Sequence, residues 1–296
     1  MDIGVALDFH GTAAAPVRWA SLRDQACRAE DVGFDVVVVP DHLYYPSADE
    51  PVGAWESVAM LGALAEATEV VRLGHSMMNL PYRPPALVAM IATTLDEISD
   101  GRYMCGLGAG NTADAEYEAF GFESSPRFGR AAEAVEIIHS MLRNGRSNLN
   151  GDHHRSVGAE VVMRGPRPTG PPIVVAAHGP KMMRLAARFA DEWNGYDHDA
   201  TGDALAPYES MLARLSEVCS AVGRDPRDLR RSLDIILGVG GVEANMGFDG
   251  SITTIAERIL RLGELGIDEV RCYIASGSNP DSIASLEPLV EAVHRH

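Results

Sequence analysis

The sequence contains no long apolar segment and no signal-peptide pattern, and it has few cysteines. No apolar stretch reaches the roughly 18 residues that a membrane-spanning helix needs. The N-terminus, Met1-Asp2-Ile3-Gly4, has neither the basic nor the apolar region of a signal peptide, so we expect a cytoplasmic protein with no membrane partner. No C-x-x-C pair occurs, which predicts reduced, mostly buried thiols at Cys27, Cys105, Cys219 and Cys272.

Positive charge is also scarce. The chain has 25 Lys and Arg residues against 42 Asp and Glu residues, which gives a net charge of −17. Such a surface repels nucleic acids and anionic membranes, so we expect a small-molecule substrate and no nucleic-acid partner. The chain has 296 residues and is 46% hydrophobic, which is enough to bury a large core without disulfides.

Short strands and amphipathic helices alternate along the whole chain. Apolar runs such as Phe-Asp-Val-Val-Val-Val predict buried strands at residues 3–8, 34–39, 71–78, 103–108, 173–177, 192–196, 233–239 and 269–275. Helical spacing predicts helices at residues 17–32, 55–67, 84–99, 127–143, 181–190, 203–222, 253–265 and 280–294. Eight βα units favour one α/β domain over residues 1–296, a (β/α)8 TIM barrel with excursions at 145–170 and 240–250. A doubly wound open sheet is the alternative.

Three histidines lie at or near the ends of the first three predicted strands, where the active site of a TIM barrel is built. They are His10, His42 and His75, and imidazole can transfer a proton near neutral pH. We favour a functional role for His42. Structural roles stay open for all three: a loop residue, a turn cap and a core histidine, respectively. A zinc site formed by these histidines, with Asp41 nearby, is another interpretation, although no H-x-H pair follows the first strand.

Two loops have the composition of ligand-binding loops. Gly106-Leu107-Gly108-Ala109-Gly110-Asn111 ends the fourth strand, and its glycines would let the backbone approach a flat ring or a phosphate. Its spacing is not that of a Rossmann fingerprint. His178-Gly179-Pro180-Lys181 joins the fifth strand to a helix, where free backbone N–H groups, the helix dipole and the Lys181 ammonium suit an anion. An ordinary turn with a surface lysine would have the same sequence.

Several short motifs occur in a fixed order along nearly the whole chain. They lie at residues 29–35, 40–43, 56–57, 80–85, 94–102, 106–111, 116–117, 179–181 and 186–194. Their order and spacing resemble those of the luciferase-like family of flavin and deazaflavin enzymes. The stretch Thr-Leu-Asp-Glu-Ile-Ser-Asp-Gly-Arg at 94–102 is the most specific of them.

This resemblance implies a ring cofactor that lies across the first four strands. It also implies a non-prolyl cis peptide near Gly74-His75-Ser76-Met77, a cofactor phosphate near Gly179 and Lys181, and a homodimer. The cofactor-binding residues that we predict are Asp41, His42, His75, Ser76, Gly108, Ala109, Gly110, Asn111, His178, Gly179, Pro180 and Lys181. His42 would be the catalytic proton donor or acceptor, with His10 as its partner.

The family divides by cofactor, one branch using FMN and O₂ and the other coenzyme F420, a deazaflavin that transfers hydride. The Asp41-His42 pair and the compact length resemble the F420 branch, so we predict an F420-dependent oxidoreductase acting on a small organic substrate. The sugar-phosphate dehydrogenases of that branch carry a glutamate after the fourth strand. Residues 108–111 lack it, which argues against glucose 6-phosphate as the substrate.

Three other functions stay open on the sequence. One is an FMN-dependent monooxygenase that works with a separate flavin reductase. The second is a metal-dependent barrel hydrolase with the three histidines as ligands, and the third is a catalytically silent barrel that binds a ligand. Aromatic residues expected near the mouth suit an apolar or aromatic ligand, or pack a lid: Tyr44, Tyr45, Trp55 and Tyr82.

Overall fold

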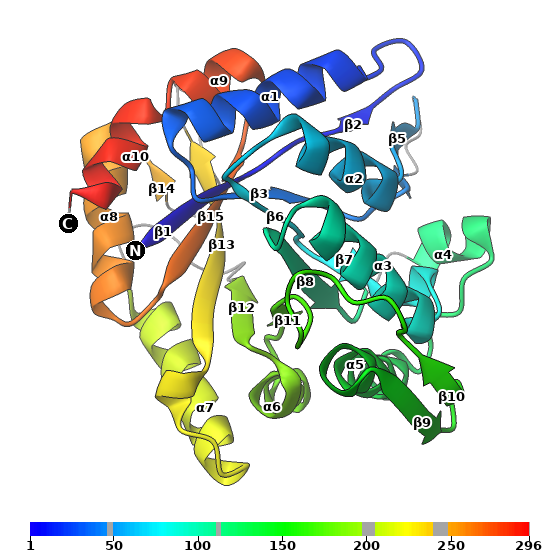
Figure 1. Cartoon of the computed structure of the whole chain (residues 1–296). Helices are drawn as coiled ribbons and strands as arrows, with labels where there is room; N and C mark the ends of the chain where they lie inside the picture. The colour runs from blue at the N-terminus through cyan, green and yellow to red at the C-terminus, as the bar shows by residue number, and fades with distance from the viewer. Residues whose placement is uncertain (46–49, 111–113, 197–204, 239–247, 296) are drawn as a thin grey trace.

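A computed structural model describes residues 1–45, 50–110, 114–196, 205–238 and 248–295. Eight parallel strands pair in the order β11, β12, β13, β15, β1, β3, β6, β8, and β8 pairs with β11 to close the sheet (Figure 1). Their bounds are β1 (Asp2–Ala6), β3 (Val36–Val39), β6 (Arg72–His75), β8 (Tyr103–Gly108), β11 (Ile173–Ala176), β12 (Glu192–Tyr196), β13 (Arg230–Gly238) and β15 (Glu269–Ile274). This closure confirms the predicted TIM barrel and excludes the open sheet.

Helices cover the outside of the barrel (Figure 1). They are α1 (Trp19–Val32), α2 (Ser57–Ala67), α3 (Pro85–Ile98), α5 (Arg127–Asn144), α6 (Pro180–Phe189), α7 (Ala206–Ala221), α8 (Ile252–Glu264), α9 (Pro280–Ala284) and α10 (Glu287–His294). All four valines of β3 are completely buried, because the strand is covered on both faces. None of the helices that the structure describes is both long and apolar enough to cross a bilayer. All four cysteines are free thiols, as predicted.

Two predicted elements are each divided in the structure. The predicted strand 71–78 is interrupted after β6 by a cis peptide between Ser76 and Met77, and β7 (Met78–Asn79) follows it. This confirms the cis peptide expected in that segment. The predicted helix 280–294 is broken between α9 and α10. Pro288 explains the break, because it has no N–H for the carbonyl of Ala284 and its ring would clash with that carbonyl.

Several short elements were not predicted. The excursion at 145–170 contains an antiparallel hairpin, β9 (Arg146–Asn150) and β10 (Arg155–Glu160). A small sheet over the first two loops has the strand order β2 (His10–Gly11), β5 (Val52–Ala54), β4 (Tyr44–Tyr45). The others are η1 (Leu80–Tyr82), α4 (Asp114–Phe120), η2 (Pro226–Asp228) and β14 (Phe248–Asp249). Most of the glycine-rich excursion at 240–250 lies outside the described residues.

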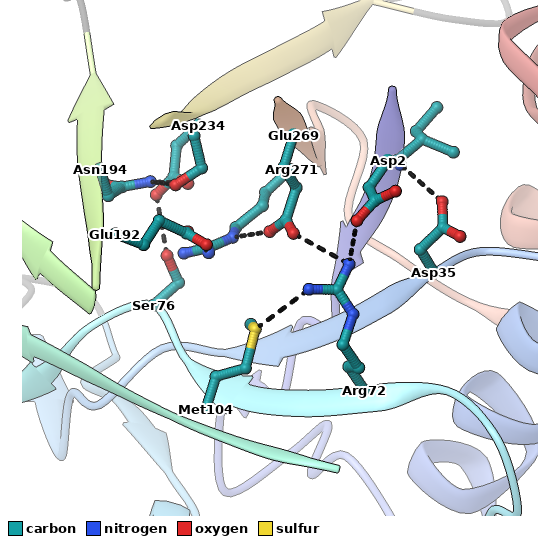
Figure 2. Close-up of polar contacts among 12 residues, drawn as sticks. Asp2, Asp35, Arg72, Ser76, Met104, Glu192, Asn194, Asp234, Glu269 and Arg271 are labelled. Carbon is teal, nitrogen blue, oxygen red and sulfur yellow. Dashed lines mark hydrogen bonds and ion pairs between the residues drawn. The ribbon is translucent and has the colours of Figure 1, made fainter. Parts of the chain in front are cut away.

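A layer of paired charges fills the amino-terminal end of the barrel (Figure 2). Arg271 is completely buried, and its guanidinium donates to Glu269 at 2.7 Å and to Glu192. Arg72 reaches the other oxygen of Glu269 at 3.1 Å, and Arg230 lies within 3.2 Å of the same carboxylate. These residues lie at or near the starts of their strands, at the end of a TIM barrel that serves stability rather than catalysis.

Candidate active site

Two cavities open at the carboxyl-terminal end of the barrel. We call the first the large cavity. It has a volume of about 720 Å³, and its wall is formed by Asp41, His42, Met77, Asn79, Gly108, Ala109, Gly110, Arg127, Phe128, Ala176, His178, Gly179, Pro180, Lys181 and Met182. The second, the small cavity, has a volume of about 340 Å³ and is lined by Ala6, Leu7, Asp8, His10, Pro40, His42, Tyr45, Ser76, Tyr273, Ile274 and Ser278. Most of the predicted cofactor residues therefore surround one cavity.

Two predicted cofactor residues lie elsewhere, and a third is not described. Ser76 lines the small cavity, His75 lines neither cavity, and Asn111 lies outside the described residues. Conversely, Arg127 at the start of α5 lines the large cavity and was not predicted. The sequence gives no signal for Arg127, because its approach to the barrel mouth depends on how α5 packs.

His42 follows β3 and occupies the boundary between the two cavities. Among the residues that the structure describes, it is the one that lines both. Its Nδ1 lies 3.4 Å from the Oε2 atom of Glu116, whose side chain is 1% exposed. The other carboxylate oxygen of Glu116 accepts the backbone N–H of Leu43 at 2.6 Å and that of Tyr44 at 3.1 Å. Glu116 on α4 thus holds the loop that carries His42 and orients the imidazole.

His10 lines the small cavity and not the large one. Its Nδ1 is 2.9 Å from the Asp8 carboxylate, which also accepts the backbone N–H of His10 at 3.1 Å. A carboxylate can only accept, so Nδ1 carries a proton and the ring is held in a fixed orientation. The rings of His10 and His42 are 6.5 Å apart, and Tyr45 contacts both of them at 5.2 and 4.9 Å. The structure thus brings the two predicted catalytic histidines to one cavity.

His75 is a core residue. It is 1% exposed, and its ring nitrogens lie 2.9 Å from the Tyr103 hydroxyl and 3.1 Å from the Ser57 hydroxyl. Ser57 donates its proton to Asp41 at 2.6 Å, so His75 Nε2 must be the donor to Ser57 and Nδ1 the acceptor from Tyr103. Burial lowers the pKa of His75 to about 4, so the ring is neutral. The cofactor contact predicted for this side chain is therefore not available to it.

Asp41 is bound to the wall of the large cavity. It is 2% exposed, and its oxygens accept from Arg83 at 2.6 and 3.1 Å, from Ser57, and from the backbone N–H of Asn79 at 2.8 Å. Burial acts to raise the pKa of Asp41, but the hydrogen bonds from Arg83 and the charges of its neighbours hold it below its ordinary value. Both oxygens are engaged by the protein, so the ionised Asp41 positions β7 and η1 beside the cavity.

The glycines at the end of β8 make room for protein backbone. A Cβ added at Gly106 would lie 1.9 Å from the carbonyl oxygen of His75, just before the cis peptide. Gly110 has a φ of +86°, and a Cβ there would lie 2.4 Å from the Tyr117 hydroxyl. We predicted that glycine lets the chain approach a ligand in this run. At these two positions it instead lets two segments of the protein approach each other.

The other end of the large cavity is positively polarised. Gly179 precedes the first turn of α6, no heavy atom lies within 4 Å of a Cβ built on it, and no side chain of the described residues caps this helix. Lys181 is the single lysine of the chain, and its Nζ lies 5.4 Å from the centre of the Phe128 ring. Arg127 is on the wall beside Phe128. The start of α6 with the Lys181 ammonium is suited to a phosphate group, and Arg127 adds a second cation to the wall near Gly110.

Of the aromatic residues expected near the mouth, only Tyr45 lines either of the two cavities within the described chain. Tyr82 is 7% exposed and packs on Phe122 at 4.9 Å between ring centres. Trp55 is half-exposed and donates its indole N–H to the Val17 carbonyl at 2.8 Å. Tyr82 is thus a packing residue, and Trp55 is held by a hydrogen bond outside the two cavities.

The zinc-site interpretation is not supported by this geometry. Both ring nitrogens of His75 are bonded to protein hydroxyls, so it cannot join His10 and His42 around a metal. In the described part of the chain, no group of three or more His, Cys, Asp or Glu side chains is arranged to hold a metal ion. The three predicted histidines therefore do not form one site.

Comparison with known proteins identifies the family. A family model described as luciferase-like monooxygenase matches residues 1–245. The chain belongs to this luciferase-like family. It is 29% identical over 295 residues to the F420-dependent glucose-6-phosphate dehydrogenase of Amycolatopsis mediterranei, covering 93% of this chain and 86% of that protein. It is 31% identical over 251 residues to the enzyme of the same name from Intrasporangium calvum, covering 80% and 72%.

One further relative and two solved structures are also similar to this chain. The chain is 34% identical over 163 residues to the 5,10-methylenetetrahydromethanopterin reductase of Archaeoglobus fulgidus, covering 55% of this chain and 45% of that protein. An F420-dependent secondary alcohol dehydrogenase in complex with an F420-acetone adduct superposes with a TM-score of 0.82 at 20% identity, covering 99% and 98% of the two chains. The monooxygenase RslO1 from Streptomyces bottropensis superposes with a TM-score of 0.79 at 20% identity, covering 100% and 99%. These two structures show that their fold is similar to the barrel of this chain.

Proposed function

We propose that this luciferase-like protein is an F420-dependent oxidoreductase that transfers hydride to or from a small organic substrate. The observation that carries the proposal is the position of His42. Among the described residues it alone faces both the large cavity, which suits a cofactor, and the small cavity, which suits a substrate. A residue at that boundary can exchange a proton with a substrate whose carbon exchanges a hydride with the cofactor.

The residues of the large cavity fit a phosphorylated deazaflavin. Its volume of about 720 Å³ lies in the usual range for cofactor and ligand pockets. We propose that Gly179, Pro180 and Lys181 hold the phosphate, with His178 beside them, and that the backbone of Gly108, Ala109 and Gly110 faces the ring. Open space at Gly179 and the uncapped start of α6 support this orientation. When bound, the deazaflavin supplies a ring carbon that accepts or gives up a hydride.

The protein's own part in the reaction is to position the substrate and move one proton. When a secondary alcohol is oxidised, its carbon loses a hydride and its hydroxyl loses a proton, and His42 accepts that proton. In the reverse direction His42 donates it to the carbonyl oxygen. Glu116 keeps the imidazole in place, and the Asp8–His10 pair is the second acid–base group at the cavity. Ser76 contributes to the wall on which the substrate rests.

Sequence similarity supports F420 over FMN. Two of the relatives described above are named F420-dependent enzymes, and they match between 80% and 93% of this chain. The family description, luciferase-like monooxygenase, keeps an FMN-dependent monooxygenase as the second candidate. We also propose a cytoplasmic homodimer with no nucleic-acid partner, because the chain is acidic and its resemblance to the family implies a dimer.

Equilibrium titration of the purified protein with F420 and with FMN tests the proposal. We expect micromolar or tighter binding of F420 and at least 100-fold weaker binding of FMN. His42→Gln should retain F420 binding within a few-fold and lose at least 100-fold in hydride transfer, because general acid–base catalysis contributes about 10²- to 10⁴-fold. Tight FMN binding with substrate-dependent O₂ uptake would instead identify a monooxygenase.

A further inference from the structure

The two cavities differ in fixed charge. The large cavity carries two permanent cations: Lys181 in the first turn of α6, and Arg127, whose guanidinium lies 3.5 Å from the Gly110 carbonyl oxygen. The small cavity is lined by no lysine and no arginine among the residues that the structure describes. Its one charged carboxylate is Asp8. Of the two cavities, only the large one, which we assign to the cofactor, thus has a lysine or an arginine in its described lining.

The rest of the chain cannot supply the missing cation to the small cavity. Residues 46–49, 111–113, 197–204, 239–247 and 296, which the structure does not describe, contain no lysine and no arginine. Arg271 is on the same strand as Tyr273, but it is completely buried and paired with Glu192 and Glu269. Among the described residues that line this cavity and the residues that the structure does not describe, histidine is therefore the only side chain that can carry positive charge.

Asp8 keeps negative charge at the wall of the small cavity. Burial acts to raise its pKa, but the hydrogen bonds from the side chain and backbone of His10 hold it below its ordinary value, so the carboxylate is ionised at neutral pH. It is not neutralised by an arginine or lysine in any of its described contacts. A doubly charged phosphate placed beside it would lose hydration and gain repulsion.

The polar groups that remain suit a neutral ligand. The Tyr273 hydroxyl donates to the Ser76 carbonyl at 3.0 Å, and Ser278 accepts the Asp8 N–H at 2.6 Å and donates to Gln25 at 2.6 Å. The hydroxyl oxygen of Tyr273 can still accept a hydrogen bond, while Ala6, Leu7 and Ile274 provide apolar surface. A volume of about 340 Å³ matches a small molecule of this mixed polarity.

From this distribution of charge we infer that the small cavity takes an uncharged alcohol or carbonyl compound and rejects phosphorylated substrates, including glucose 6-phosphate. The inference rests on the proposed function, because it assigns the small cavity to the substrate of the F420-dependent reaction. It separates this chain from the relatives that are named glucose-6-phosphate dehydrogenases. Specificity here follows from an unpaired and repelled charge, which discriminates more strongly than a change of shape.

The test uses the enzyme loaded with F420 and pairs of ligands that differ by one phosphate. Suitable pairs are glycerol with glycerol 3-phosphate and glucose with glucose 6-phosphate, and a set of neutral secondary alcohols and ketones is included. Binding is followed through the fluorescence of bound oxidised F420, and hydride transfer through the loss of its absorbance. We expect at least one neutral compound to bind and react, and every phosphate ester to do so at least 100-fold less well.

Asp8→Asn is the diagnostic variant, because it removes the negative charge and keeps the shape. It should narrow the preference for neutral over phosphorylated ligands by about 10-fold. Asp24→Asn on the outer face of α1 is the matched control and should leave the preference unchanged. The inference is wrong if glucose 6-phosphate binds or reacts as well as the neutral compounds. It is also wrong if none of the neutral compounds binds or reacts. Failure to bind F420 at all would instead overturn the proposed function.

Discussion

The Ser76 hydroxyl donates a hydrogen bond of 2.9 Å to Asp234, which lies 158 residues further along the chain (Figure 2). Asp234 also accepts from the Asn194 amide at 2.9 Å, and the Tyr273 hydroxyl bonds the Ser76 carbonyl at 3.0 Å. Three strands from the second half of the chain, β12, β13 and β15, thus fix the segment between β6 and β7. This contact joins the barrel interior to the wall of the small cavity.

Asp234→Asn should loosen this segment. Burial raises the pKa of Asp234, and the hydrogen bonds from Asn194 and Ser76 oppose this shift by stabilising the carboxylate. Asparagine has one acceptor oxygen. If that oxygen faces the Asn194 amide, the new amide faces Ser76, whose hydroxyl then accepts while its proton loses the acceptor that Asp234 provided. We expect the free energy of unfolding to fall by about 1–3 kcal/mol, the cost of an unsatisfied buried group, and F420 affinity to fall several-fold. Urea denaturation and cofactor titration measure the two effects, and equal values for variant and wild type would contradict the role.

Gly106→Ala should prevent the normal packing of β8 against the segment after β6. The added methyl group would meet the His75 carbonyl oxygen at 1.9 Å, and both are backbone-anchored. We expect a loss of several kcal/mol in unfolding free energy, or failure to fold, since overpacking of a core costs at least about 1–3 kcal/mol. Gly179→Ala is the matched control, because nothing lies within 4 Å of its added Cβ and the loss there should stay below about 1 kcal/mol. Similar thermal stability of the two variants would be the contrary result.

His75 predicts a specific dependence of stability on pH. Its pKa falls from the ordinary 6.5 to about 4 on folding, because burial outweighs the attraction of Asp41 and Glu56 while Arg83 adds repulsion. Between these values the unfolded chain binds the proton and the folded protein does not. The contribution of His75 to the free energy of unfolding is therefore fully present above about pH 6.5. It decreases as the pH falls to about 4, by roughly 3 kcal/mol in total.

Urea unfolding of the wild type and of His75→Gln at pH values from 7 to 4 isolates this contribution. The variant is expected to be less stable at pH 7, because glutamine cannot reproduce both hydrogen bonds. As the pH falls across the same interval, the unfolding free energy of the variant should decrease less steeply, because its unfolding takes up about one proton fewer. Parallel curves for the two proteins would show that His75 does not remain neutral in the folded state.

Lys181→Gln should weaken binding of the phosphorylated cofactor alone. Loss of one exposed cation at a helix N-terminus is worth on the order of 1 kcal/mol, so we expect about 5- to 10-fold weaker F420 binding at low salt. The deazaflavin nucleoside without phosphate should bind the variant and the wild type equally. Arg188→Gln, near the other end of α6, is the control and should change neither affinity. An equal loss for both ligands would place Lys181 away from the phosphate.

The sequence determined the alternation of strands and helices because those signals are local, whereas the pairing of β8 with β11 decided between a barrel and an open sheet. The run Val36–Val39 predicted a strand covered on both faces, and all four valines are buried. Pro288 is a local signal as well, but we predicted a continuous helix across it, and the structure breaks that helix. Part of the candidate site could also be predicted from the sequence, because residues that follow the parallel strands of a barrel all lie at the same end of it. For that reason His10, His42 and Lys181 could be named from their order alone.

Tertiary structure decided which of these side chains face a cavity. His75 follows the same pattern as His42, yet its ring is turned into the core by Tyr103 and Ser57, which are distant in sequence. Glu116 belongs to a motif of the family resemblance, but its role and that of Asp234 had no local signal, because both roles depend on contacts across the barrel. The hydrophobic pattern of the sequence specifies where a strand ends. The burial of a side chain, the tautomer of a histidine and the pairing of charges depend on neighbours that only the closed sheet brings together.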